Sequence, residues 1–176
     1  MAEDFLAGLD GGLDDLRQRA RRVVEVLRGS AVDVPEYDPT AHGPLVSFDG
    51  LDGFEEVDRY WVNAPYAFVF VGFDAENDEH RYHVVEPHLD DFERELLDTL
   101  YDDIRDALIY DATYDPEDRE AVLKAQMQRL LSEYAVDVDP NAFYRLFYYL
   151  HRAFEGFEKL DPLMRDPHIE DISCDG

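Results

Sequence analysis

The stretch from residue 60 to residue 86 constrains the fold more than any other, because two strand-like runs flank a polar interruption. Residues 60–73 read YWVNAPYAFVFVGF, a run of aromatic and β-branched side chains, and the polar segment DAENDE separates it from HRYHVVE. Two such runs around a polar turn predict an antiparallel hairpin. Between Tyr66 and Val71 both alternating sets of side chains are apolar, so we expect this strand to be covered on both faces.

Three helices are predicted after the hairpin. They span residues 91–110, 116–134 and 140–157. The first begins at a capping-box-like pair, Asp90 and Glu93, and its apolar side chains recur every four positions. Each of the other two begins at an aspartate, Asp115 or Asp139, that is followed by proline, the residue favoured at the first helical position.

The predicted helix over 140–157 is strongly aromatic. Its apolar side chains are spaced four, three, four and three positions apart, at Phe143, Phe147, Leu150, Phe154 and Phe157. This seam favours a helix that is buried between neighbours over an exposed surface for a partner. Three tyrosines, at positions 144, 148 and 149, widen the apolar arc, which leaves open a contact with another domain or subunit.

The region before the hairpin predicts one helix and a linker. Residues 13–28 place six apolar side chains on one helical stripe, with arginines on the remaining face. Residues 29–58 contain three prolines and four glycines, which interrupt both helical and strand periodicity.

The predicted fold class is therefore α+β. It consists of an antiparallel β-hairpin followed by a three-helix bundle, with an extra N-terminal helix and a truncated C-terminal strand. We expect three parts: the helix and linker (1–58), the hairpin and three helices (59–158), and the incomplete start of a sheet-containing subdomain (159–176).

Charge narrows the possible functions. The chain has 42 acidic and 16 basic residues, a formal net charge of −26, and only two lysines, Lys124 and Lys159. Because the acidic residues are spread evenly along the chain, the composition favours a protein adapted to high salt over an acidic protein of an ordinary cytosol. Nucleic-acid binding is disfavoured because it needs a basic face.

We expect a cytoplasmic chain. The single cysteine, Cys174, excludes an internal disulfide and fits a reducing compartment. The first residues are acidic where a signal peptide is basic, and no apolar run approaches the roughly 18 residues of a membrane span.

The predicted helix over 13–28 contains a group of arginines, unlike the rest of this acidic chain. Two interpretations remain open. The arginines form a solvated face with pairs such as Asp15 and Arg19. Alternatively, Arg17, Arg21 and Arg28 dock onto an acidic partner.

Motifs for catalysis, cofactors and metals are not found. Neither lysine follows a glycine, as a phosphate-binding loop requires, so no cofactor site is predicted. His80 and His83 are an odd number of positions apart and point to opposite faces of a strand, which argues against a metal site. Cys174 has His168 six residues away, but at the end of this sequence nothing is expected to hold a third group in place, which argues against a catalytic cysteine.

The last sixteen residues, DPLMRDPHIEDISCDG, resemble a known signature. The signature is the D-P-x-I-E-D-I motif of type II/type IV secretion-system ATPases, and the resemblance is greatest to the archaeal branch that drives archaella and type IV pili. The matching positions are Asp166, Pro167, Ile169, Glu170, Asp171, Ile172 and Gly176. Residues 63–69 (NAPYAFV) and 82–89 (YHVVEPHL) are similar to strands of that family.

This resemblance implies the non-catalytic N-terminal region of a hexameric motor. The implied partners are other motor subunits, a membrane platform protein and accessory proteins, and the chain would lie in the cytoplasm and reach the membrane through them. ATP and Mg²⁺ are expected only for a full-length member, because the family's nucleotide-binding loop lies outside these residues. Ile169 to Cys174 is expected to form a short strand, and Asp175-Gly176 a turn into the next strand.

Two other functions are compatible with the sequence. One is a self-contained acidic interaction module that binds its partner through residues 140–157. The other is a stand-alone enzyme, which has the least support because no site is assembled in the sequence.

Overall fold

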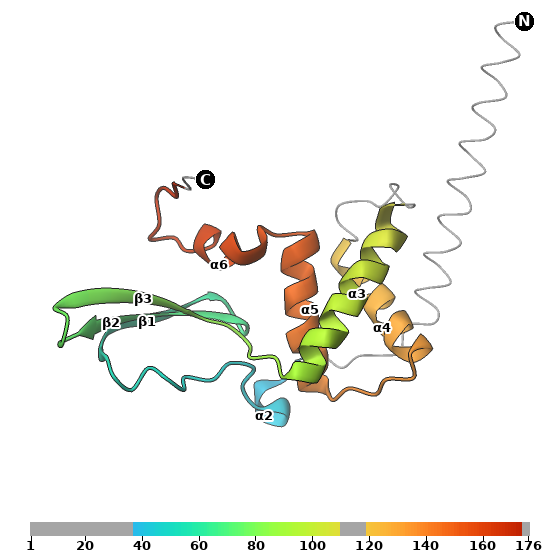
Figure 1. The fold of residues 1–176 in the computed structure, drawn as a ribbon, viewed down its shortest axis with the longest axis horizontal. Coiled ribbons are helices and arrows are strands. Elements are labelled where there is room, and N and C mark those ends of the chain that lie inside the picture. Colours follow the sequence, from blue (N-terminus) through green and yellow to red (C-terminus); the bar gives the residue numbers. More distant parts are fainter. Residues whose placement is uncertain (1–36, 110–118, 174–176) are drawn as a thin grey trace, which may run out of the picture. The chain divides into compact units, whose positions relative to one another are not determined.

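The computed structural model describes residues 37–109 and 119–173. The chain divides into two compact units. Of the described residues, 37–97 and 138–173 belong to the first, called the sheet unit below, and 98–109 and 119–137 belong to the second, called the helical unit. The predicted α+β class is confirmed, and Figure 1 shows the element order along the chain. The expected three-part division stays a prediction.

The sheet has three antiparallel strands in the order β1-β2-β3. They are β1 (Glu55–Asn63), β2 (Ala67–Asp74) and β3 (Glu79–Val85). The predicted hairpin is confirmed as β2 and β3. The prediction of one strand over residues 60–73 is wrong, because a turn closed by the Tyr66 N–H on the Asn63 carbonyl (2.7 Å) divides it into β1 and β2. Pro65 lies in this turn and has no N–H for a ladder.

β1 also begins earlier than the sequence suggests. Its first residues, 55–58, fall within the range predicted as linker. All four are exposed and three of them are charged, so they do not produce the alternation by which a half-buried strand is recognised. Such an exposed, charged edge is how natural sheets avoid pairing with other chains.

The register sorts the sheet's side chains onto two faces. One, called the tyrosine face, carries Tyr60, Val69, Val71, Tyr82 and Val84. The other, called the tryptophan face, carries Trp61, Phe68, Phe70, His83 and Val85.

Both faces of β2 are covered, as predicted. The C-terminal segment lies on one side of the sheet and the chain that follows α2 (Pro39–His42) lies on the other (Figure 1). Phe48 and Phe54 pack on the tryptophan face, where ring centroids lie 5.0 Å from Phe68 and 4.8 Å from His83, respectively. The first four residues of β2 are consequently buried.

The three helices predicted after the hairpin correspond to α3, α4 and α5. α3 (Asp91–Ile109) begins at the predicted capping box, in which the Glu93 N–H donates to Asp90 (2.8 Å) and the Asp90 N–H donates to Glu93 (3.1 Å). α4 (Arg119–Glu133) belongs to the helical unit, as does the part of α3 from Asp98 onward. In this unit Leu100 and Ile104 are fully buried.

α5 (Pro140–Phe154) is a core helix, as its spacing predicted. Asp139 caps it by accepting a hydrogen bond from the Ala142 N–H (2.8 Å), and Pro140 occupies the first turn. Seven of its side chains are buried: Ala142, Phe143, Tyr144, Leu146, Phe147, Tyr148 and Leu150. The helix ends three residues before the predicted boundary, and Phe157, at 60% exposure, lies outside the buried seam.

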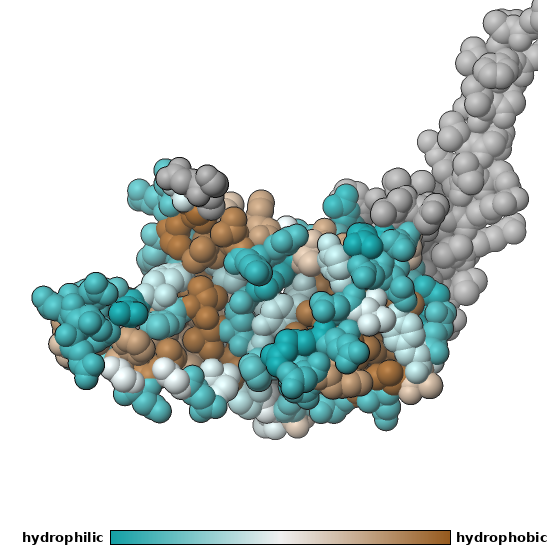
Figure 2. Space-filling model, viewed as in Figure 1, coloured by the Kyte–Doolittle hydropathy of each residue, from teal (hydrophilic) through white to brown (hydrophobic). Residues whose placement is uncertain are grey.

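After α5 the chain forms a short 3-10 turn, η2 (Glu158–Leu160), and one helical turn, α6 (Asp161–Met164). In Figure 2 the surface of the described residues is largely hydrophilic, with a hydrophobic patch over this region. Leu160 and Met164 are exposed there. Residues 169–173 form no strand, so the strand expected from Ile169 is not present there. A strand needs a paired neighbour, and the described sheet ends at β1 and β3.

Several predictions fall outside the described residues. They concern the helix over 13–28 with Arg17, Arg21 and Arg28, the start of the helix at 116, and Cys174 and Gly176.

Candidate functional site

Buried carboxylates identify the candidate site. In so acidic a chain most carboxylates face water, and only three are buried in the described part: Glu93, Asp161 and Asp166, at 4%, 2% and 4% exposure. Burial of a carboxylate is unfavourable unless hydrogen bonds replace its hydration. Two of the three lie five positions apart in the C-terminal segment, and one of these, Asp166, belongs to the signature.

Asp166 is held on the tyrosine face by donors from two strands. The hydroxyls of Tyr82 on β3 and Tyr60 on β1 both donate to Oδ2, at 2.5 and 2.8 Å. The other oxygen, Oδ1, accepts the backbone N–H of His168 at 2.8 Å and lies 3.1 Å from the His168 ring Nδ1. We call this group the tyrosine joint: Asp166, Tyr60, Tyr82 and His168.

The pKa shifts within the tyrosine joint favour stable hydrogen bonds over proton transfer. Burial alone raises the pKa of Asp166, but hydrogen bonds from Tyr82, the His168 N–H and Tyr60 outweigh it, and the pKa is lowered. Burial, together with the hydrogen bond to Asp166, raises the pKa of Tyr60 to about 12 and also raises that of Tyr82. At neutral pH the carboxylate is therefore charged, and both phenols keep the protons that they donate.

A second buried carboxylate fixes the chain just before the joint. Asp161 accepts hydrogen bonds from Arg165 Nε (2.6 Å) and from the Phe157 N–H (3.3 Å). Gly156 packs so closely that a Cβ atom there would lie 2.4 Å from Asp161 Oδ1. Residues 156–168, called the C-terminal corner below, are thus held at Asp161 and again at Asp166.

A third set of contacts joins the end of β3 to α5. Glu86 Oε1 accepts hydrogen bonds from the Tyr148 hydroxyl and from Arg152 Nη1, and the Tyr149 hydroxyl donates to the Pro87 carbonyl (2.6 Å). The Arg152 guanidinium lies 4.6 Å from the Tyr149 ring centroid.

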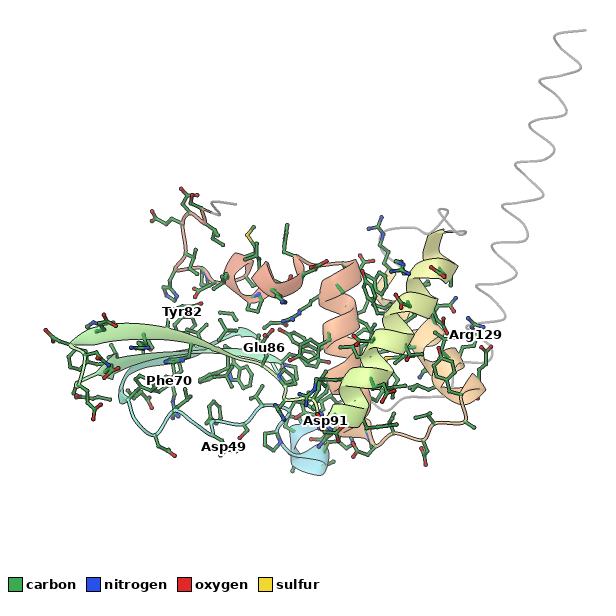
Figure 3. All side chains as sticks on the ribbon, in the orientation of Figure 1. Asp49, Phe70, Tyr82, Glu86, Asp91 and Arg129 are labelled. Carbon is green, nitrogen blue, oxygen red and sulfur yellow. The ribbon has the colours of Figure 1, made fainter. Side chains whose placement is uncertain are left out.

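One turn into α3, Glu93 adds a further link to α5. Its buried carboxylate pairs with Arg145 as well as closing the capping box. Figure 3 shows Tyr82 beside the C-terminal segment and Glu86 beside α5. The sheet is therefore joined to α5 and to the C-terminal corner by charge-assisted hydrogen bonds.

The signature residues are placed unequally. Asp166 is at the centre of the joint, Ile169 and Ile172 are half-buried, and Pro167, Glu170 and Asp171 are exposed. The predicted opposition of His80 and His83 is confirmed by the register, which pairs them with Phe73 and Phe70. Within the described ranges, no three His, Cys, Asp or Glu side chains are grouped so as to hold a metal ion.

Sequence reasoning missed the residues that receive Asp166. Tyr60 and Tyr82 were assigned only to strands, although they are hydroxyl-bearing side chains on a face where β2 contributes Val69 and Val71. A buried tyrosine hydroxyl requires a hydrogen-bond partner, and that requirement was the available signal.

Comparisons with known proteins bear on the same segments. Residues 14–88 match the family model described as PilB3-like, N-terminal, which supports an N-terminal part of a pilus ATPase for this stretch. The uncharacterized protein MJ1288 of Methanocaldococcus jannaschii is 30% identical over 111 residues, which are 62% of this chain and 44% of that protein. The chain thus spans less than half the length of the curated relative that it matches. Tyr60 and Tyr82 lie inside the range matched by the family model, and Asp166 lies outside it.

Proposed function

We propose that this chain is the non-catalytic N-terminal region of a type II/type IV secretion ATPase, of the kind that assembles pili or archaella. In this role it couples a hexameric motor to a membrane platform protein and to accessory proteins. The match of residues 14–88 to a PilB3-like N-terminal region supports the proposal. So does the signature-like segment that begins at Asp166.

The tyrosine joint is the observation that carries the proposal. A coupling region has to pass a displacement from the segment that leads to the motor to the surface that meets partners. Asp166 makes this connection because its carboxylate is bonded to β1 and β3 of the matched region. A solvated tether at the same place would absorb the displacement instead.

In this proposal, ATP hydrolysis and membrane insertion belong to other parts of the assembly. ATP and Mg²⁺ belong to the motor domain of a full-length protein, and the chain reaches the membrane through its partners in the cytoplasm. Among the described helices, none is both long and apolar enough to cross a membrane.

Two measurements test the proposal. The purified chain should show no Mg²⁺-dependent ATP turnover above background, and measurable turnover would contradict it. Overproduction of the chain in a piliated haloarchaeal host should lower the number of surface pili, because the chain occupies platform sites without supplying hydrolysis. A pilus number equal to that of the empty-vector strain counts against coupling to the platform.

A second candidate is a self-contained acidic interaction module. The docking of Asp166 onto the sheet fits this candidate as well, because the tyrosine joint forms entirely within the sheet unit. Its binding surface would lie away from α5, whose aromatic seam is buried. This candidate predicts that the overproduced chain leaves piliation unchanged.

We also propose that the acidic surface is an adaptation to high salt. A formal charge of −26 on 176 residues repels itself, and salt screens that repulsion as the Debye length shortens. The free energy of unfolding in urea should therefore rise between about 0.2 M and about 3 M KCl. A constant or falling value would contradict the adaptation.

A further inference from the structure

We propose that the tryptophan face is a docking surface for a basic, extended segment of a partner protein, with an arginine side chain in the pocket beside β3. The proposal rests on three features of this face: half-exposed aromatic rings, an adjoining pocket, and a carboxylate at its rim. It goes beyond motor coupling and can be tested on the chain alone.

The aromatic part is a row that crosses the sheet. Trp61, Phe68 and Val85 lie directly opposite one another on β1, β2 and β3. The ring centroids of Trp61 and Phe48 lie 5.1 and 5.0 Å from that of Phe68, both in edge-to-face geometry. Trp61 is 46% exposed and Phe48 is 45% exposed, while Phe68 between them is buried. Exposed aromatic rings on a rigid sheet are typical of the residues that dominate binding energy at interfaces.

A pocket of about 600 Å³ continues this row beyond Val85. Its walls are the loop that contains Ser47, Asp49 and Leu51 and the end of the β3 strand, together with Glu86 and His88 just beyond it. The strand residues that line it are His83, Val84 and Val85. Figure 3 shows Asp49 on the same side of the sheet as Phe70 and opposite Tyr82. The loop that forms one wall of the pocket therefore lies on the face that is not occupied by the C-terminal corner.

The charges around the pocket select the ligand. Asp49 is exposed and accepts a hydrogen bond from the Ser47 hydroxyl (2.6 Å), with no basic side chain paired to it among the described residues. Glu86 is already paired with Arg152, and Arg59 on the same face is paired with Glu56 (3.2 Å). The remaining charge is negative, which favours a cation and disfavours acidic peptides and nucleic acids.

Arginine fits this combination better than lysine. Its planar guanidinium can pair with the Asp49 carboxylate and also stack on an exposed aromatic ring such as that of the neighbouring Phe48. The floor of the pocket provides a further acceptor. His83 Nε2 is buried without a hydrogen-bond partner, and a guanidinium N–H that reached the floor would supply one.

The test uses the full chain and a defined probe. The probe is the peptide acetyl-Thr-Val-Arg-Val-Arg-Val-amide, and its control has glutamate in place of both arginines. Trp61 is the single tryptophan of the chain and the peptides contain none, so its emission reports binding at this face. We expect a saturable change of Trp61 emission with the arginine peptide and none with the glutamate peptide.

Variants separate a specific site from general attraction to an acidic protein. Asp49→Asn should weaken binding of the arginine peptide about fivefold, the loss of one partly exposed ion pair. Phe48→Ala should weaken it by at least as much. The matched control Glu120→Gln removes an exposed carboxylate from α4 and should leave the dissociation constant unchanged. Equal effects of Asp49→Asn and Glu120→Gln, or no saturable change of emission with the arginine peptide, would overturn the proposal.

Discussion

Asp166→Asn should destabilise the sheet unit by far more than an ordinary carboxylate substitution. The side chain keeps its shape, but one of its two acceptor oxygens becomes an NH₂ donor and the charge is lost. The Tyr60 and Tyr82 hydroxyls share Oδ2, and the His168 N–H uses Oδ1. An NH₂ group at Oδ1 would face the His168 N–H, donor against donor, and an NH₂ group at Oδ2 would deprive both phenol protons of their charged acceptor. Hydrogen bonds to a charged group contribute roughly 1.5–3 kcal/mol and neutral ones about 1 kcal/mol. Weakening two of them lowers the free energy of unfolding by about 3 kcal/mol.

Urea unfolding at fixed KCl, with an unchanged m-value, measures this loss. The matched control is Asp171→Asn, an exposed signature position in the same segment, which should change stability by less than about 0.5 kcal/mol. Hydrogen exchange should also accelerate in residues 161–173 of the Asp166→Asn variant before the rest of the sheet unit opens. If Asp166→Asn and Asp171→Asn lower the free energy of unfolding by the same small amount, the tyrosine joint does not hold the C-terminal segment.

Three further outcomes follow from the same contacts. Gly156→Ala should lower the free energy of unfolding by about 2 kcal/mol, because its Cβ would lie 2.4 Å from a buried carboxylate oxygen, whereas Gly53→Ala meets nothing within 4 Å; equal urea midpoints would contradict this. Arg145→Met should cost about 3 kcal/mol by leaving the buried Glu93 carboxylate without its cation, and a loss below 1 kcal/mol in the same titration would show that the capping box alone satisfies it. Tyr60 has a pKa raised to about 12, so its contribution to the free energy of unfolding is complete below its unfolded pKa of about 10 and is lost as pH rises toward 12. Tyr60→Phe should reduce this loss of stability at alkaline pH. An unchanged dependence of stability on pH would contradict a hydrogen-bonded phenol at this position.

Local patterns predicted the elements whose causes are local. The capping box before α3 and the aspartate cap of α5 involve residues three positions apart, so their chemistry can be recognised along the chain. The double cover of β2 followed from apolar side chains on both alternations. β1 was misjudged because its start is an exposed, charged edge.

The candidate site could be predicted only in part. The resemblance singled out Asp166 as a signature position and said nothing of what it contacts. Its partners, Tyr82 and Tyr60, lie 84 and 106 positions away, and a sequence with 42 acids does not show which carboxylates the fold will bury. The pairing of Glu86 with Arg152 was unpredictable for the same reason, since it depends on how α5 meets the sheet.

A double-mutant cycle between Tyr82→Phe and Asp166→Asn measures the connection between the sheet and the C-terminal segment most directly. A joint that links the two predicts a coupling free energy of about 1–2 kcal/mol between these substitutions. Additive losses, with no coupling, would show that the segment is not held by this hydrogen bond and would remove the physical basis for transmission through the sheet.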